Sequence, residues 1–522
     1  MKAISILSLT GIGAALLGLT LAACGGGSDT AVPQERNTLA KAEGFITSGP
    51  AQATALPGSD YDIKPLLTVG DEVPLLTGTW PNLQSHPNKT FALAGLPDGL
   101  GSLRANGYNW VWVNHEMSAG NLTDFSKTIS GQIDGARVSI FKFNDEWECL
   151  GGMNLVDTIK DASGKIGEIK LQGNKVTQWG YAFSRFCSSS LSTQFAGGDP
   201  VYFPGEETSG GRGWAIYTNG SAVAIDDAQR CARENNVPLR GYTEQAVLCG
   251  LDDSTNRPFV LYVGDKDNQD PDGLKSGKSY VLNLEDGSGN FIQNTGALSV
   301  GGSYTVSWTE IPAEYKDNQA GYYAWSAAAD WRGSDFVRLE DGQEDPNKDL
   351  DFYFVTTGSN GTYDVYGSLF KLEFNEADPL GNATLTLVAE GGPGSFLSPD
   401  NITIDEDGYL YAQEDINGGA PINQLIAENR NGSIWRMKLD GSEQQRIITQ
   451  DQTPYDGVNT AGALVGIGAD IWETSGIIEV DTGAGSAKLL FSVQAHSVND
   501  PADMNDGNYY QGGQLVLATP SN

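Results

Sequence analysis

Five strand-like runs in this chain end on clusters of acidic or amide side chains. Each run is apolar or aromatic and then turns polar, as in NWVWVNHE and GYLYAQED, and the runs span residues 109–116, 201–207, 259–267, 351–360 and 408–415. Carboxylates crowded together resist ionisation unless a cation compensates them. A pocket built from such ends would therefore be able to bind calcium, iron or manganese. The alternative is that solvated acidic loops simply follow the strands.

The elements that carry these ends are expected to be strands arranged around a ring. Side chains alternate along a strand, so equivalent strands in a ring bring their polar ends to one axial face. The chain has 66 glycines among 522 residues, short β-branched and aromatic runs, and no sustained helical periodicity after the N-terminus. This texture predicts an all-β fold with many short strands and tight turns.

The predicted architecture is a six-bladed β-propeller with loop insertions, and five or seven blades remain open. The expected polar ends are Glu116, Glu207, Asp267, Thr357 and Glu414. A last strand at residues 513–518 would complete the first sheet and remove an exposed edge. One helix is expected at residues 222–235, packed on the outside.

The N-terminus has the pattern of an exported lipoprotein. Met1-Lys2 is followed by an apolar stretch and then by Leu21-Ala22-Ala23-Cys24, which resembles a bacterial lipobox. We expect a signal peptide at residues 1–23, a lipidated Cys24 with a flexible tether at residues 24–64, and one propeller domain at residues 65–522. A spanning signal-anchor is the alternative. The predicted location is the bacterial outer membrane, cell surface or periplasm, with lipid as the sole membrane contact.

The charge of the chain limits its partners. Lys and Arg number 32 against 66 Asp and Glu, a formal net charge of -34. Such a chain repels nucleic acid and anionic lipid headgroups, so no nucleic-acid partner is expected. The charge fits either an exported protein kept soluble by its surface or one that binds several divalent cations.

Four cysteines remain once Cys24 is assigned to lipid. An exported location permits disulfides. Cys231 and Cys249 are close in sequence and flank a polar insert, so we predict that they pair. Cys149 and Cys187 could also pair, or Cys187 could be a thiolate metal ligand.

An ordered set of motifs resembles a known family. The set is Asn114-His115-Glu116, Phe186-Cys187 with Gly205-Glu206-Glu207, Phe336 to Gly342 (FVRLEDG), and Asp400-Asn401 before Glu414-Asp415. Together these segments resemble the PhoX-type alkaline phosphatases and their secreted relatives, from about residue 65 to the C-terminus. The resemblance implies a β-propeller whose axial pocket holds iron (Fe³⁺) and calcium (Ca²⁺) and cleaves phosphate esters at alkaline pH.

The resemblance also implies roles for individual residues. It makes Arg338 the phosphate-holding group and, with Glu116, a catalytic residue. The implied metal ligands are Asn114, Glu116, Cys187, Glu206, Glu207, Glu340, Asp400, Asn401 and Glu414. Thiolate and carboxylates suit ferric iron, hard oxygen ligands suit calcium, and a guanidinium suits phosphoryl oxygens. Glu473, Ser475 and His496 resemble further segments of the secreted relatives, without an assigned role.

Several other hydrolase classes lack their motifs here. The chain has three histidines, His86, His115 and His496, so a histidine-rich zinc site is not expected. His115 stands between two candidate ligands on a strand, where alternation turns it away from them. GxSxG, Walker and HExxH motifs are absent from the sequence.

Two functions of different classes remain. The first is an extracytoplasmic, metal-dependent phosphoric ester hydrolase, a monomer that releases phosphate from small organic phosphomonoesters. The second is a non-enzymatic, calcium-stabilised propeller used for binding or surface assembly. Phosphoryl transfer at a multi-metal site needs cations that neutralise the ester and position an oxygen nucleophile, which is compatible with the carboxylate-rich ends.

Overall fold

Strands dominate the part of the chain that the computed structural model describes, as the sequence predicts. The described residues are 44–119, 122–124, 132–172, 175–326, 328, 331–416, 419–455, 472–481, 487–496, 498 and 511–521. The expected signal peptide and the lipidation of Cys24 lie outside them. All belong to one unit, Arg36–Asn522. No described helix is long and apolar enough to cross a bilayer.

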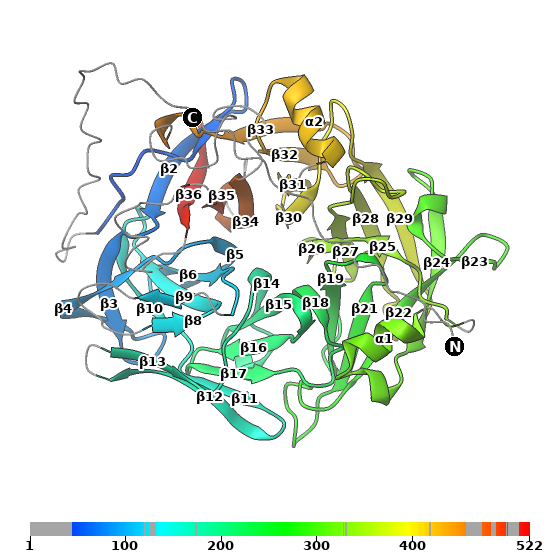
Figure 1. Ribbon diagram of the computed structural model, residues 1–522, viewed down its shortest axis with the longest axis horizontal. Helices are drawn as coiled ribbons and strands as arrows, with labels where there is room; N and C mark the ends of the chain where they lie inside the picture. The colour runs from blue at the N-terminus through cyan, green and yellow to red at the C-terminus, as the bar shows by residue number, and fades with distance from the viewer. Residues whose placement is uncertain are drawn as a thin grey trace, which may run out of the picture. The chain divides into compact units, whose positions relative to one another are not determined.

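Six of the described strands form a closed ring in which each packs against the next. In ring order they are β5 (Pro97–Ala105), β14 (Phe186–Ser192), β18 (Cys231–Pro238), β26 (Leu339–Glu344), β30 (Pro399–Ile404) and β34 (Trp472–Asp481). Figure 1 shows these strands around a common centre, with further strands extending outward from them. The fold is therefore an all-β arrangement of the propeller type.

Each ring strand is the innermost strand of a series of paired strands. β34 continues into β35 (Lys488–Ala495), β36 (Gly512–Pro520) and β2 (Tyr61–Thr68). β5 continues into β6 (Tyr108–His115), β9 (Arg137–Phe143), β10 (Cys149–Asn154), β3 (Glu72–Thr77) and β4 (Gln84–Ala92). β30 continues into β31 (Tyr409–Glu414), β32 (Ser433–Lys438), β33 (Gln445–Gln450) and β1 (Ala53–Ala55).

The other three series are hydrogen-bonded to one another. The β14 series holds β15 (Val201–Gly211), β16 (Trp214–Tyr217), β17 (Ser221–Ala224), β11 (Thr158–Asp161), β12 (Gly164–Gln172) and β13 (Lys175–Trp179). The β18 series holds β19 (Gln245–Asp252), β21 (Val260–Asp265), β22 (Lys278–Glu285), β23 (Phe291–Ile292) and β24 (Ser303–Glu310). The β26 series holds β27 (Asp351–Thr356), β28 (Ser368–Glu373) and β29 (Ala383–Glu390). Neighbours within the six series are antiparallel, except that β3 is parallel to β10 and β11 is parallel to β17.

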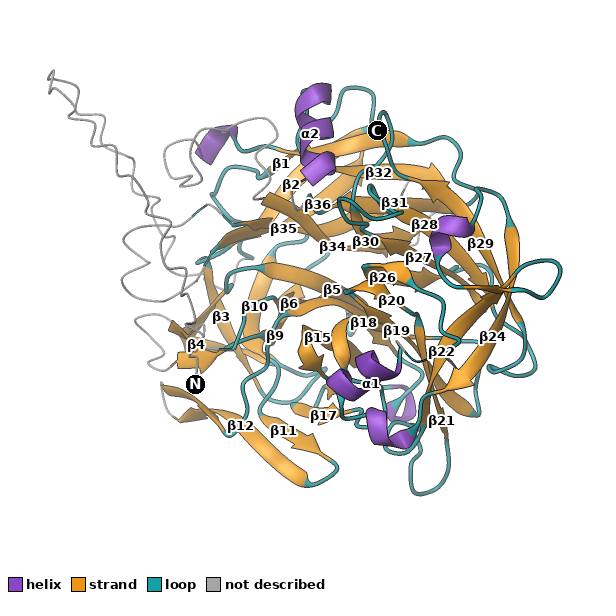
Figure 2. Cartoon of the chain, turned by 45° about the vertical axis from the view of Figure 1, so that its right-hand side comes forward, coloured by secondary structure: helices purple, strands orange, loops and turns teal. Residues whose placement is uncertain are grey.

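Smaller elements fill the connections. β20 (Thr255–Arg257) pairs with β25 (Phe336–Val337), and β7 (Leu122–Asp124) pairs with β8 (Gln132–Asp134). Two α-helices, α1 (Gln319–Trp325) and α2 (Gly419–Glu428), are described, and both lie outside the ring (Figures 1 and 2). Short 3₁₀ turns occur at Ala196–Gly198, Thr295–Ala297, Ala313–Tyr315 and Thr453–Tyr455.

The two ends of the unit meet in one sheet. β36 lies between β2 and β35, with Tyr61 opposite Pro520 and Leu489 opposite Ala518. The prediction that the last strand completes the first sheet is wrong in its partner: residues 109–115 belong to β6 in the β5 series, whereas β36 joins the β34 series, where the N-terminal strand β2 covers its outer edge. The expected tether ends before residue 64, because β1 and the start of β2 lie within residues 24–64 and are already paired.

The helix expected at residues 222–235 is wrong. That segment instead contains the end of β17 and the first half of β18. Ala222 and Ala224 alternate with half-buried positions and pack into the core, and β18 is a ring strand buried almost throughout. Tertiary pairing overrides the weak helical propensity of this stretch.

The hydrophobic core lies between neighbouring sheets. Trp110, Trp112 and Trp214 are among the largest fully buried side chains, and they belong to one cluster that spans the β5 and β14 series. A second cluster, which contains Phe259, Phe352 and other side chains, spans the β18 and β26 series. Packing between sheets leaves the polar residues of the ring strands at the centre.

Candidate metal centre

A one-residue β-bulge occurs at the same place in all six ring strands of the described structure. Between two paired positions the ring strand has one residue more than its partner: Pro97/Leu100, Phe186/Ser189, Arg233/Asn236, Leu339/Gly342, Pro399/Ile402 and Thr474/Ile477. A bulge interrupts the alternation and re-aims a side chain. The first residues of the six bulges are Asp98, Cys187, Glu234, Glu340, Asp400 and Ser475.

Five of these six residues form a continuous set of possible metal ligands. Asp98, Glu116 and Cys187 have ligand atoms within 4.8 Å of one another, as do Cys187, Glu207 and Glu234, and also Glu234, Glu340 and Asp400. Cys187 and Glu234 each belong to two of the three groups. We call these seven residues the ligand cluster.

The burial of the ligand cluster fits bound cations. Asp98 Oδ1, Glu234 Oε2 and Asp400 Oδ1 are buried and accept no hydrogen bond. Burial, reinforced by neighbouring carboxylates, raises the pKa of Asp98 and of Asp400 well above its usual range and raises the pKa of Glu234 to about 8. A cation would satisfy these oxygens and offset the repulsion.

The donor types indicate which cations the cluster suits. A thiolate with carboxylates is a favourable set for iron, and a purely carboxylate set is favourable for calcium. Burial raises the pKa of the Cys187 thiol, so deprotonation there would depend on a bound cation.

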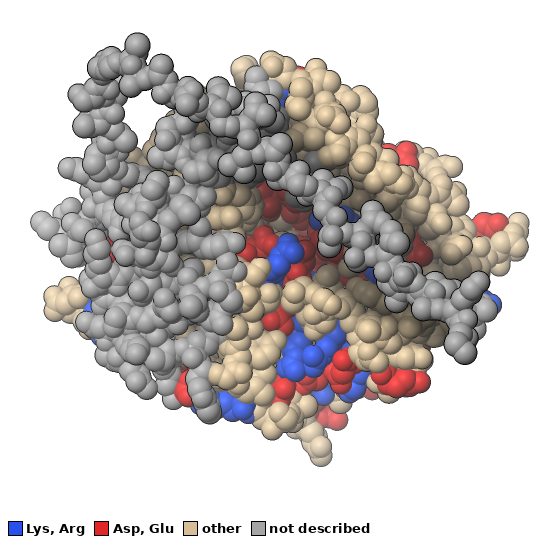
Figure 3. Space-filling model, viewed as in Figure 1, with Lys and Arg blue, Asp and Glu red and all other residues tan. Residues whose placement is uncertain are grey.

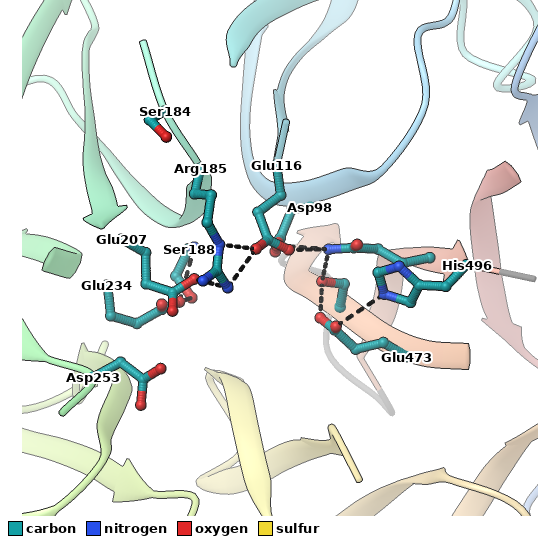
Figure 4. A network of polar contacts seen from close by, with 12 residues as sticks. Asp98, Glu116, Ser184, Arg185, Ser188, Glu207, Glu234, Asp253, Glu473 and His496 are labelled. Carbon is teal, nitrogen blue, oxygen red and sulfur yellow. Dashed lines mark hydrogen bonds and ion pairs between the residues drawn. The ribbon is translucent and has the colours of Figure 1, made fainter. Parts of the chain in front are cut away.

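Two arginines flank the cluster. Arg185 Nε donates to Glu116 Oε1 at 2.8 Å, and its Nη2 lies 2.6 Å from Glu207 Oε2. Arg338 donates from Nε and Nη2 to the two oxygens of Asp253, at 2.7 and 3.0 Å. Figure 3 shows acidic and basic atoms together in a hollow near the middle of the face in view, and Figure 4 shows Arg185 between Glu116 and Glu207.

A hydrogen-bond network borders the cluster on the β34 side (Figure 4). Gln494 Nε2 donates to Asp98 Oδ2 at 2.8 Å, to Glu116 Oε2 at 3.1 Å and to Ser475 Oγ at 3.2 Å. Glu473 accepts from Ser475 and lies 3.6 Å from His496 Nε2. At the first bulge residue this side of the ring therefore has a hydroxyl, Ser475, where the other sides have a carboxyl group or a thiol.

The structure brings together five of the residues that the sequence assigned to metal. They are Glu116, Cys187, Glu207, Glu340 and Asp400. Two amides lie beside them without joining the three groups. Asn114 Nδ2 donates to the carbonyls of Cys187 and Ser188, and Asn401 Oδ1 accepts from Ser188 Oγ at 2.9 Å.

Glu206 and Glu414 lie outside the ligand cluster. Glu206 accepts from Trp214 Nε1 and the Ser184 backbone, and Glu414 accepts from Trp435 Nε1 and pairs with Arg430. Both residues pair with the ring strand immediately before the bulge, opposite Phe186 and Pro399. Strand alternation therefore turns them away from the axis, and the next residues, Glu207 and Asp415, follow on the other face.

His115 lies opposite Pro97 on β6, the position equivalent to that of Glu206 and Glu414 in their strands. Its side chain points away from the ligand cluster, as expected. Its Nδ1 lies 3.0 Å from the Gly95 carbonyl oxygen and its Nε2 lies 2.9 Å from Ser139 Oγ. Burial lowers the pKa of His115 to about 3, so the ring is neutral.

The sequence-based reasoning missed Asp98, Glu234, Asp253 and Arg185, and it misplaced one polar end. Asp253 follows β19, the strand next to the ring, whereas the predicted Asp267 follows β21 and is exposed. A signal for Asp98 exists in the sequence, because LPDG and SPDN repeat a Pro-Asp pair at Pro97 and Pro399, the starts of β5 and β30.

The predicted Cys231–Cys249 disulfide is wrong. Cys149, Cys187, Cys231 and Cys249 are all free and buried. Cys249 lies opposite Val237, so Cys231 sits six positions further along β18. Six residues of strand span about 20 Å, far beyond the reach of a disulfide.

Comparison with known proteins places the fold. No family model matches the chain, and no curated protein sequence does. Among solved structures, Pseudomonas fluorescens PhoX in complex with vanadate, a transition state analogue, superposes with a TM-score of 0.59 at 14% identity, covering 92% of this chain and 98% of that one. The fold is PhoX-like.

Two further solved structures give lower TM-scores than PhoX. A subtype N11 neuraminidase-like protein of A/flat-faced bat/Peru/033/2010 gives a TM-score of 0.35 at 8% identity, over 88% of this chain and 97% of that chain. An ancestral GH74 enzyme also gives 0.35, at 10% identity, over 78% of this chain and 35% of that chain. The likeness to PhoX concerns the fold.

Proposed function

We propose that this protein is an extracytoplasmic, metal-dependent phosphoric ester hydrolase that releases phosphate from organic phosphomonoesters. The observation that carries the proposal is the buried ligand cluster, linked through Cys187 and Glu234 and flanked by Arg185 and Arg338. A site that combines cations with guanidinium groups is suited to a phosphoryl group, whose transfer depends on charge neutralisation. The PhoX-like fold and the vanadate bound in that neighbour support the same class of substrate.

Each of the three groups of the cluster would hold a cation. The thiolate of Cys187 favours iron in its two groups, and the carboxylates of Glu234, Glu340 and Asp400 favour calcium. When bound, these cations would neutralise the ester and supply a positioned oxygen nucleophile.

The arginine and acidic residues of this chain perform the remaining tasks. Asp253 fixes the Arg338 guanidinium through two hydrogen bonds, and the Arg338 side chain stays 22% exposed. Arg338 is thus oriented to donate to phosphoryl oxygens as negative charge develops on them. Glu116 offers one carboxylate oxygen to the ligand cluster, and its orientation is set because Oε1 accepts from Arg185 and Oε2 accepts from Gln494.

We also propose a six-bladed architecture and a cellular location for this protein. Six ring strands, each the start of a sheet series, support a six-bladed propeller. We propose that the mature chain is a monomer anchored by lipid on Cys24 at the outer membrane or cell surface, as the lipobox-like segment indicates. Small phosphate esters, rather than nucleic acid, are its proposed partners.

Hydrolysis of a chromogenic phosphomonoester at alkaline pH tests the function. The full chain, purified in detergent, is assayed with and without a chelator, alongside elemental analysis of bound iron and calcium. Turnover that the chelator abolishes, in protein that contains iron, is the expected result. Absence of turnover in calcium-loaded, iron-free protein would favour the calcium-stabilised binding propeller instead.

An Arg338→Gln variant separates the enzyme from a scaffold. We expect kcat/KM to fall about 100-fold, the loss typical of a charge-assisted hydrogen bond made in the transition state, while bound metal is retained. Arg240→Gln is the matched control, because Arg240 also pairs with a buried carboxylate, Glu344, but lies outside the ligand cluster. Equal activities of the two variants would remove Arg338 from the site.

A further inference from the structure

Arg185 and Arg338 occupy equivalent positions in the ring. Each stands two residues before the first bulge residue of its strand, Cys187 or Glu340. The Arg185 carbonyl accepts from the Glu207 backbone at 2.8 Å, and the Arg338 carbonyl accepts from the Thr357 backbone at 3.0 Å. Both residues have a left-handed backbone, with φ of 50° and 59°.

This position is set by the architecture and not by the arginine side chains. Leu96 and Ser398 hold the same place before β5 and β30, with φ of 48° and 45°, and their carbonyls accept the corresponding hydrogen bonds. Of the six equivalent residues, Leu96, Arg185, Ala232, Arg338, Ser398 and Glu473, only two are cationic. The ring therefore presents positive charge on the β14 and β26 sides, and an acid on the β34 side.

The two guanidinium groups approach the same pair of carboxyls. Arg185 contacts Glu207, Arg338 contacts Asp253, and Asp253 is itself in side-chain hydrogen-bond contact with Glu207. Within the described residues, no hydrogen bond uses Nη1 of either arginine. The Arg185 side chain is 42% exposed, against 22% for Arg338. Both arginines thus keep donors available beside the ligand cluster.

We propose that Arg185 is a second phosphate-binding arginine that makes the site selective for phosphomonoesters over phosphodiesters. This inference rests on the proposed function. A phosphomonoester dianion has three non-bridging oxygens, whereas a diester has two and a single negative charge. A site with cations and a guanidinium on each side of the phosphoryl group can engage all three oxygens of the monoester. The diester lacks the third oxygen, so one of these groups has no partner.

Binding of inorganic phosphate by calorimetry is the first measurement. It compares the native full chain with Arg185→Gln, Arg185→Lys and Arg240→Gln, each with its bound metal quantified. Arg240 matches Arg185 closely, because its side chain is 40% exposed and pairs with the buried Glu344, and it lines a separate cavity of about 440 Å³ among the ring strands. We expect Arg185→Gln to weaken phosphate binding about 10- to 100-fold with metal content unchanged, the range for one charge-assisted hydrogen bond. Arg185→Lys recovers part of the loss, and Arg240→Gln matches the native chain.

The second measurement compares kcat/KM for para-nitrophenyl phosphate and bis(para-nitrophenyl) phosphate. Arg185→Gln should lower the monoester value more than the diester value, so their ratio falls about tenfold, which a structural role would not cause.

Three outcomes overturn the inference. If the native chain binds and hydrolyses phosphate compounds while Arg185→Gln binds phosphate equally well, Arg185 has no substrate role and the proposed function stands. Loss of metal from both Arg185 variants would show that Arg185 serves to balance the charge of Glu116 and Glu207 and does not bind phosphate. If the native chain neither binds phosphate nor hydrolyses the ester, the proposed function and this inference fail together.

Discussion

Glu206 and Glu207 are neighbours on β15, yet their carboxyl groups belong to different environments. Glu206 accepts from Trp214 Nε1 at 3.1 Å and from the Ser184 backbone at 3.1 Å, between sheets. Glu207 faces the axis, pairs with Arg185 and shares a metal-ligand group with Cys187 and Glu234. One Glu-Glu motif thus contains one residue that holds the fold and one that serves the site.

The isosteric variants Glu206→Gln and Glu207→Gln should affect different properties, the first stability and the second metal binding. Glu206→Gln turns an amide toward a set of hydrogen-bond donors and should cost about 2 kcal/mol of unfolding free energy, with bound metal retained. Glu207→Gln should reduce bound metal, because a neutral amide replaces an anionic ligand. Urea denaturation and elemental analysis of both variants provide the comparison. A loss of metal in the Glu206 variant alone would reverse the assignment.

Cys187→Ser should remove iron from the protein. Cys187 is shared by two of the three ligand groups, and a hydroxyl is a much weaker ligand than a thiolate. Turnover should fall by at least about tenfold, since substrate charge would be less well neutralised. Cys249→Ser is the control, because Cys249 is also fully buried but lies in the core of the β18 and β26 series. Iron retained in Cys187→Ser at the native level would contradict the assignment.

The four described cysteines should titrate as free thiols. Denaturing the unreduced chain in the presence of a chelator should expose Cys149, Cys187, Cys231 and Cys249 to a thiol reagent. Reductant should leave the melting temperature unchanged, because no disulfide joins the four described cysteines. Peptide mapping identifies each labelled cysteine. If Cys231 and Cys249 both resist the thiol reagent until reductant is added, they form the disulfide that the register of β18 and β19 rules out.

Glu479 should make stability fall as the pH rises. Burial first, and then Asp405, Glu406 and Asp407, raise its pKa from 4.5 to about 7. A raised carboxyl pKa contributes stability that is complete below 4.5 and is lost as the pH rises through about 7. Glu479→Gln should therefore be more stable than the native chain at pH above 7, by at most about 1 kcal/mol because the side chain is half exposed.

Urea unfolding across the pH range measures this difference. The advantage of Glu479→Gln should shrink as the pH falls through about 7 and should level off below 4.5, where the native carboxyl is protonated in both the folded and the unfolded state. The exposed Glu376 gives a control variant, Glu376→Gln. A difference that stays constant with pH would show that Glu479 acts through packing instead of charge.

Part of the candidate site could be predicted from the sequence because several of its residues stand at the polar ends of strands. Glu116 and Glu207 were identified as polar ends, and both reach the ligand cluster. Asp98 was not identified because it stands near the start of a ring strand, where a polar residue resembles a turn or a cap, and Glu234 was not identified because it lies in the stretch that was expected to be a helix. Their role depends on the bulges, and a bulge is visible only when two strands are paired.

The sequence by itself determined the all-β character, the existence of a C-terminal strand and the concentration of carboxylates, because these follow from local alternation, turn residues and composition. Only the tertiary structure decided which neighbour of each acidic pair faces the axis and which cysteine lies among the carboxylates. Glu207 and Glu206 differ by a single strand position, and Cys187 meets Glu234 across two ring strands. Register, bulges and contacts between sheets are long-range properties, and no local pattern of residues encodes them.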